Sequence, residues 1–181
     1  MGAAAQGCCC EAVRVSWYSP QAISDSEELT RFVFLPMHVD RRGNVKPNFF
    51  DYVHSHGCSV QRTAMATLDE LVYFVESFLA RKSDSVWLGA VSASCREIRA
   101  IRYDDDSRAV CVYDTGERRN PAHGELFATR YDIEEADGPE LRARLRAAFN
   151  VGTIVGRQHY HDGTVWAGLT PAAQARTQKK R

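Results

Sequence analysis

The clearest pattern in the chain is an apolar stripe between residues 68 and 81. Five large apolar side chains recur three or four residues apart: Leu71, Phe74, Val75, Phe78 and Leu79. This spacing places them on one face of an α-helix. Thr67 stands three residues before Glu70 and completes a capping box, in which each residue bonds the other's backbone. The pattern predicts an amphipathic helix over residues 68–81.

A second helix is predicted over residues 139–150. Pro139 lies where a helix begins, and a proline is tolerated there because the first turn has no partner for its missing N–H. Four apolar residues then face one side: Leu141, Leu145, Ala148 and Phe149. The two helices account for the long periodic segments, so the remaining elements must be short strands.

Short apolar runs predict these strands. They are residues 13–18, 31–38, 86–91 and 126–131, with a hairpin formed by residues 101–103 and 109–113. Pro36 indicates a sheet edge or a strand end, and Ser92 is expected to cap a single helical turn that ends near Ile98. Strands and helices do not alternate strictly, which favours an α+β fold over a doubly wound sheet. We expect one domain over residues 13–169, with a mixed or antiparallel sheet packed by the two main helices, and disorder over residues 1–12 and in the basic tail 170–181.

Composition restricts the classes of function. The 181 residues are 44% hydrophobic and 25% charged, and 23 basic residues balance 23 acidic ones. A neutral chain has no overall attraction to nucleic acid or anionic lipid, so such binding needs a local patch. No signal peptide or long apolar segment is evident, and few of the basic residues are lysines. We expect a soluble bacterial cytoplasmic protein that has no membrane contact and six reduced cysteines, with Cys58, Cys95 and Cys111 in the core.

Four of the six histidines form two His-x-His pairs, His54 with His56 and His159 with His161. In an extended segment, residues two apart point to the same face, so each pair presents two imidazoles to one cation. The cofactor is unknown from sequence, and a divalent metal at these histidines is the candidate. The alternative is that both pairs lie in polar loops and bind nothing.

Two segments carry residues suited to acid–base chemistry. The first runs from His56 through Gly57 and Cys58 to Arg62, and the second joins Asn120 and Pro121 to His123 and Glu125. If His56 and His123 meet in space, they form an acid and a base of the metal-independent ribonuclease type, with Arg62 or Arg119 at the phosphate. Glu125 would orient an imidazole or accept a proton. The alternative places Cys58 and Val60 in the core, Ser59 and Gln61 in water, and Arg62 in an ion pair.

Two functions follow from these observations. The first is a small accessory or regulatory module that binds a protein or nucleic-acid partner, which requires no special residue. The alternative is a histidine-based phosphodiesterase, nuclease or nucleotide-processing enzyme, metal-dependent in one version, that uses His56, Arg62, His123 and Glu125. Fingerprints of the common nucleotide-binding loops are absent from the sequence. The sequence gives neither the partner nor the oligomeric state.

Overall fold

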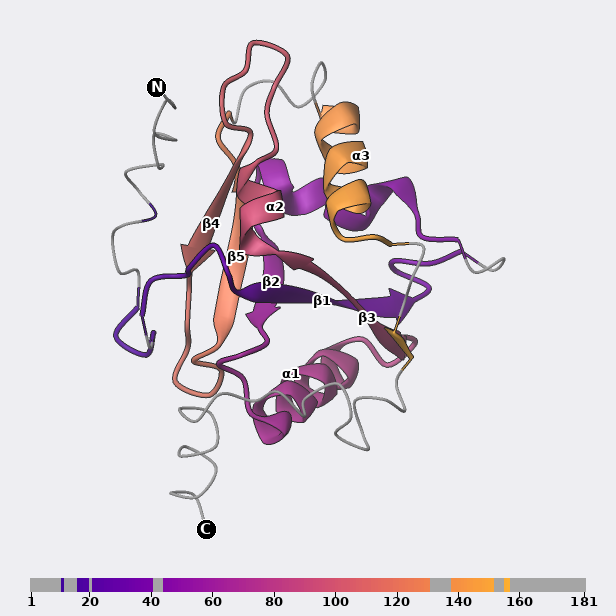
Figure 1. Ribbon diagram of the computed structural model, residues 1–181. Coiled ribbons are helices and arrows are strands. Elements are labelled where there is room, and N and C mark those ends of the chain that lie inside the picture. The colour runs from indigo at the N-terminus through magenta and orange to yellow at the C-terminus, as the bar shows by residue number, and fades with distance from the viewer. Residues whose placement is uncertain are drawn as a thin grey trace.

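A computed structural model describes residues 11, 16–19, 21–40, 44–130, 138–151 and 155–156 (Figure 1). The termini and the segments between these ranges, with His159 and His161, lie outside the described residues. In chain order the elements are β1 Glu28–Leu35, η2 Pro47–His54, β2 Cys58–Arg62, α1 Leu68–Arg81, β3 Val86–Ser94, α2 Cys95–Arg99, β4 Val110–Asp114, β5 His123–Ala128, α3 Gly138–Ala148 and β6 Val155–Gly156. No helix among them is long and apolar enough to cross a bilayer.

The described strands form one antiparallel sheet in the order β4-β5-β2-β1-β3-β6. β1 pairs with β3 along its whole length, from Glu28 opposite Ser94 to Leu35 opposite Val86. Against β2 it keeps only two pairs, Leu29↔Arg62 and Thr30↔Gln61. Beyond these pairs β1 and β2 diverge, and Figure 1 shows β1 and β3 crossing β4 and β5 at a steep angle. This divergence opens the sheet at its centre.

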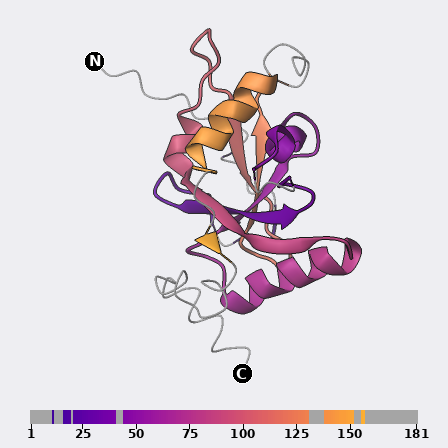
Figure 2. The same ribbon diagram turned by 90° about the vertical axis from the view of Figure 1, so that its right-hand side faces the viewer.

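Helices cover both faces of the sheet (Figures 1 and 2). α1 packs on the face that presents Phe32 and Phe34 of β1, and its Leu71 and Val75 are buried there. On the other face, α3, η2 and α2 pack on a larger core with alternate side chains of the central strands, as a sheet covered on both sides requires. The fold is α+β, with helices close to the two predicted ranges.

The two long helices begin where the sequence indicates. Thr67 Oγ1 accepts a hydrogen bond from the Glu70 N–H at 3.3 Å, and Glu70 Oε2 accepts one from the Thr67 N–H at 2.9 Å, so the predicted capping box is confirmed. α3 starts at Gly138 and Pro139 and ends at Ala148, two residues before the predicted end. Asn150 adopts a positive φ of 44° just beyond that end, a conformation that stops a helix.

Several strand boundaries differ from the prediction. β1 lies at 28–35 rather than 31–38, and Pro36 follows its end. Residues 16–19 form no strand, whereas residues 12–15 lie outside the described part. Ser94, not Ser92, caps α2, because Ser94 accepts from the Glu97 N–H while Ser92 belongs to β3. β5 starts at His123 rather than near Leu126, because its first residues alternate polar and small side chains that carry no apolar signal.

Candidate functional site

A groove runs between α1 and the strands β2 and β5. In the register of these strands Gln61 lies opposite His123 and Ser59 opposite Glu125. Alternate residues of a strand share one face, so these four side chains form one polar patch beneath α1. The cavity above the patch measures about 530 Å³. We call it the outer groove; it is lined by Ser59, Tyr73, Phe74, Ser77, Arg81, Glu117, Arg118, Arg119, Asn120, His123 and Glu125.

Three exposed arginines stand at the rim of the outer groove. Arg118 and Arg119 occupy a tight turn that Glu117 and Asn120 close through two backbone hydrogen bonds of 2.9 and 3.0 Å. Arg119 Nη1 donates to the Tyr73 hydroxyl at 3.1 Å. Neither Arg81 nor Arg118 forms an ion pair with any described residue. The rim therefore carries positive charge available to an anionic ligand.

His123 is held at the floor of the groove with one ring nitrogen engaged. Its Nδ1 lies 2.8 Å from Thr115 Oγ1 and 3.3 Å from the Thr115 carbonyl oxygen. A carbonyl only accepts, so a proton on Nδ1 satisfies this contact in both the neutral and the charged ring. Nε2 has no partner among the described residues and is left to exchange a proton with a ligand. The centre of the Phe74 ring lies 6.4 Å from the centre of the imidazole ring.

Glu125 is the second titratable group on this floor. Burial raises the pKa of its carboxyl group; the nearby His123 lowers it and Glu117 raises it further. A carboxylate with a raised pKa is a stronger base at neutral pH than an ordinary one. His123 and Glu125 are two residues apart on β5, about 7 Å along the strand, and both line the groove. This spacing places a base and an acid on either side of a group of phosphate size.

A second cavity, of about 210 Å³, opens where β1 and β2 diverge. We call it the inner cavity; it shares Ser59, Phe74 and Arg81 with the outer groove, so the two adjoin. Its lining combines aromatic residues, Phe32, Phe34, Tyr52, Phe74 and Phe78, with polar ones, Thr30, Arg31, His38, Ser59, Gln61 and Arg81. The inner cavity is thus an aromatic extension of the polar groove.

Comparison of the chain with protein-family models, curated proteins and solved structures finds no match. The chemistry of the site is therefore inferred from its geometry.

The structure separates the residues that the sequence proposed for catalysis. His123 and Glu125 lie together in the outer groove, whereas neither His56 nor Arg62 lines it. His56 is exposed in the turn before β2, with Nδ1 3.0 Å from Ser55 Oγ, at the end of the strand remote from His123. Arg62 is fully buried on the other face of the sheet, 2.7 Å from both Glu27 and Asp114.

The first His-x-His pair does not present two imidazoles together. His54 ends the helical segment η2 and is buried, with no hydrogen bond at either ring nitrogen to any described residue, whereas His56 is exposed. The extended geometry assumed for the pair is absent here, because η2 continues to His54. Among the described residues no three His, Cys, Asp or Glu side chains gather to hold a metal ion.

The three described cysteines are buried, as predicted. Burial raises the pKa of the Cys58 thiol, and that of Cys95 to about 12. A thiol with a raised pKa stays protonated and is a poor nucleophile. Cys58 therefore packs in the core and takes no part in the groove.

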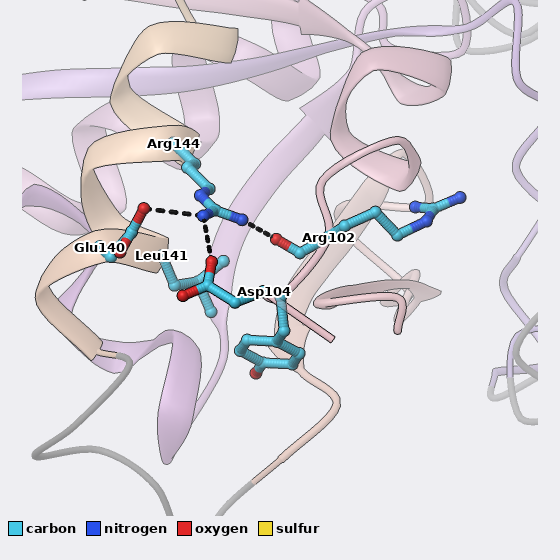
Figure 3. Close-up of a pocket in the computed structure, with 6 residues that line it drawn as sticks. Arg102, Asp104, Glu140, Leu141 and Arg144 are labelled. Atoms are coloured by element: carbon cyan, nitrogen blue, oxygen red, sulfur yellow. Dashed lines mark hydrogen bonds and ion pairs between the residues drawn. The ribbon is translucent and has the colours of Figure 1, made fainter. Parts of the chain in front are cut away.

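A third hollow, between α3 and the turn after Arg102, is filled by its own ion pairs (Figure 3). Arg144 Nη2 lies 2.8 Å from Asp104 and 2.7 Å from Glu140, and Nη1 donates to the Arg102 carbonyl. The remaining space is about 10 Å³, room for no more than one water molecule. These contacts fasten α3 to the turn and leave no room for a ligand.

The sequence did not predict the groove floor provided by β2, and it did not single out Arg31, which lines the inner cavity. The non-catalytic alternative for this segment places Ser59 and Gln61 in water, but α1 lies over them and Gln61 is only 1% exposed. The available signal was the alternation of Ser59 and Gln61 with apolar Cys58 and Val60. The signal for Arg31 was one charged residue inside an apolar run.

Proposed function

We propose that the protein cleaves phosphodiester bonds of RNA in the outer groove by general acid–base catalysis. The observation that carries the proposal is that His123 and Glu125 share the floor of a groove whose rim holds three arginines without a carboxylate partner among the described residues. Arginines bind phosphate oxygens in pairs, and an acid and a base complete the minimum set for this reaction.

The proposed reaction uses Glu125 as a carboxylate and His123 as an imidazolium. The Glu125 carboxylate removes the proton of the ribose 2′-hydroxyl, and the 2′ oxygen forms a bond to phosphorus. The bond from phosphorus to the 5′ oxygen breaks, and the His123 imidazolium gives its Nε2 proton to that oxygen. The products are a 2′,3′-cyclic phosphate and a 5′-hydroxyl. Both catalytic groups then return to their starting states by proton exchange with water.

The arginines contribute by electrostatics. Negative charge grows on the phosphate oxygens in the transition state, and guanidinium groups fixed nearby stabilise it more than they stabilise the substrate. Arg119 is oriented by the Tyr73 hydroxyl and by stacking of its guanidinium 5.8 Å from the Tyr73 ring centre. Arg81 approaches from α1, so the phosphate is held between helix and turn.

Binding without turnover is the second candidate, and the rim arginines favour it independently of the catalytic pair. Arg81, Arg118 and Arg119 suffice to hold a phosphate chain on a module that regulates or recruits. The two candidates share a ligand and differ in what His123 does. A protein of this second kind keeps its affinity for RNA when His123 is replaced and cleaves nothing in any form.

Replacing either catalytic group tests the proposal. We expect His123→Ala and Glu125→Gln each to lower the rate of cleavage of a short single-stranded RNA by about 10²–10⁴-fold, the usual contribution of an acid or base. RNA affinity and the circular dichroism spectrum should change little. Cleavage is followed by gel electrophoresis of end-labelled RNA, with the cyclic phosphate identified by mass spectrometry.

His56→Ala is the matched control, because His56 is exposed and lies outside the groove. Its cleavage rate should equal that of the unaltered protein. Absence of cleavage by the unaltered protein, or equal rates for His123→Ala and the unaltered protein, would contradict the proposal.

A further inference from the structure

Arg31 and Arg62 are both buried in the sheet, yet their partners differ. Arg62 is matched by two carboxylates, Glu27 and Asp114. Arg31, 8% exposed, donates to the Ser59 carbonyl at 2.8 Å and the Phe49 carbonyl at 2.9 Å, and its Nε has no partner among the described residues. It forms no ion pair with any described carboxylate. A buried guanidinium with donors to spare is expected to serve acceptors that a ligand brings.

Gln61 is a second buried polar side chain that lacks hydrogen-bond partners among the described residues. It is 1% exposed and lines the inner cavity, and neither Oε1 nor Nε2 has a hydrogen-bond partner among the described residues. An unsatisfied buried amide is unfavourable for folding, so a ligand that supplies its missing partners would bind favourably. A simple anion would satisfy only the amide donor. A ligand that meets both atoms must carry a donor beside an acceptor.

The walls of the inner cavity restrict the shape of that ligand. Phe34 and Phe78 stack with ring centres 4.1 Å apart, and Phe32 and Phe74 lie 5.6 Å apart on the same side. Flat aromatic surfaces favour a planar ring. The cavity adjoins the outer groove, so a ring bound here would belong to a molecule whose phosphate reaches the arginine rim.

We propose that the inner cavity is the base-binding subsite of the outer groove and selects guanine. Arg31 donates to O6 and N7, the two adjacent acceptors of that base, and Gln61 bonds its ring N–H and neighbouring polar edge. The amide of Gln61 can turn to suit either kind of partner, so discrimination rests on Arg31, which only donates. Adenine and cytosine place an amino group where guanine and uracil place a carbonyl, and uracil has no N7.

This assignment rests on the proposed function only in taking a nucleotide as the ligand. It is tested by binding rather than by cleavage, so the two can fail separately. Titration calorimetry of the full chain with 5′-GMP, AMP, UMP and CMP should show GMP binding about tenfold or more tightly than AMP, the discrimination expected of a good two-point contact. Guanosine should keep this preference over adenosine, because the contacts lie on the base.

Two variants and one altered ligand locate the preference. Arg31→Lys keeps the charge and loses the planar pair of donors, so the ratio of GMP to AMP affinity should fall to about twofold or less. Gln61→Met has a similar shape without the amide, and should weaken GMP binding while the protein unfolds at a higher temperature. 7-deaza-GMP lacks the N7 acceptor and should bind less tightly than GMP to the unaltered protein. This measurement requires no change in the protein.

Equal affinity for the four nucleotides would overturn the proposal. So would no saturable binding of GMP at several millimolar, a preference unchanged by 7-deaza substitution, or guanosine and adenosine binding alike.

Discussion

At the scale of single residues, partners decide what a buried arginine does. Arg62 has a local environment in which every contact is internal: it bonds two carboxylates and the Gln21 carbonyl at 2.7 Å. Its place in one short segment with His56 and Ser59 suggested a catalytic role from sequence. The structure places it in the opposite core, where its contacts hold the segment before β1 against the end of β4.

Removing Arg62 should therefore affect stability rather than chemistry. We expect Arg62→Ala to lower the free energy of unfolding by about 3–5 kcal/mol, because Glu27 and Asp114 would be left buried without a counter-charge. Urea denaturation followed by circular dichroism measures the loss. A variant as stable as the unaltered protein but unable to cleave RNA would show instead that Arg62 acts in the reaction.

The pair proposed here as base and acid could be predicted from sequence only in part. The sequence singled out His123 and Glu125, but it paired His123 with His56 as acid and base, and it placed the strand after these residues, near Leu126. Their common face became visible only because β5 begins at His123. The non-catalytic alternative places Gln61 in water, because a polar residue that alternates with Val60 in a short strand ordinarily faces solvent. What lies above a strand is decided by segments far away in sequence, here by α1.

At the scale of elements, α1 is both the best predicted helix and one wall of the site. Its apolar stripe and its cap are local properties, so sequence alone defines both. Its outer residues Tyr73, Ser77 and Arg81 line the groove, and their position depends on where the helix starts. β2 was not predicted as a strand, because five residues with mixed polarity give a weak pattern.

Loss of the α1 cap should therefore destabilise the fold by a defined amount. We expect Thr67→Ala to lower the free energy of unfolding by about 1 kcal/mol, because the Glu70 N–H at 3.3 Å loses its acceptor. Thr67→Ser keeps the oxygen and should recover most of that loss. Thermal denaturation of the three proteins provides the comparison; equal destabilisation by Ala and Ser would show that packing of the threonine methyl, not the cap, is responsible.

At the scale of the whole molecule, the inner cavity exists because the sheet opens between β1 and β2. Arg31 Nη1 donates a hydrogen bond across the opening to the Ser59 carbonyl. This side-chain bond stands where a backbone hydrogen bond between paired strands would otherwise lie. Pairing and divergence of strands depend on the packing of both helical layers, so no local pattern announces them. The fold class was predictable from the mixture of elements, whereas the inner cavity was not.

The dependence of RNA cleavage on pH tests the central claim most directly. The Glu125 base works only when deprotonated, and burial raises its pKa above the ordinary 4.5, so kcat/KM should rise with pH through a limb displaced above the usual carboxyl range. Measured on a guanosine-containing dinucleotide, Glu125→Gln should lack this acidic limb. A profile in Glu125→Gln with the same acidic limb and the same rates as the unaltered protein would contradict the account.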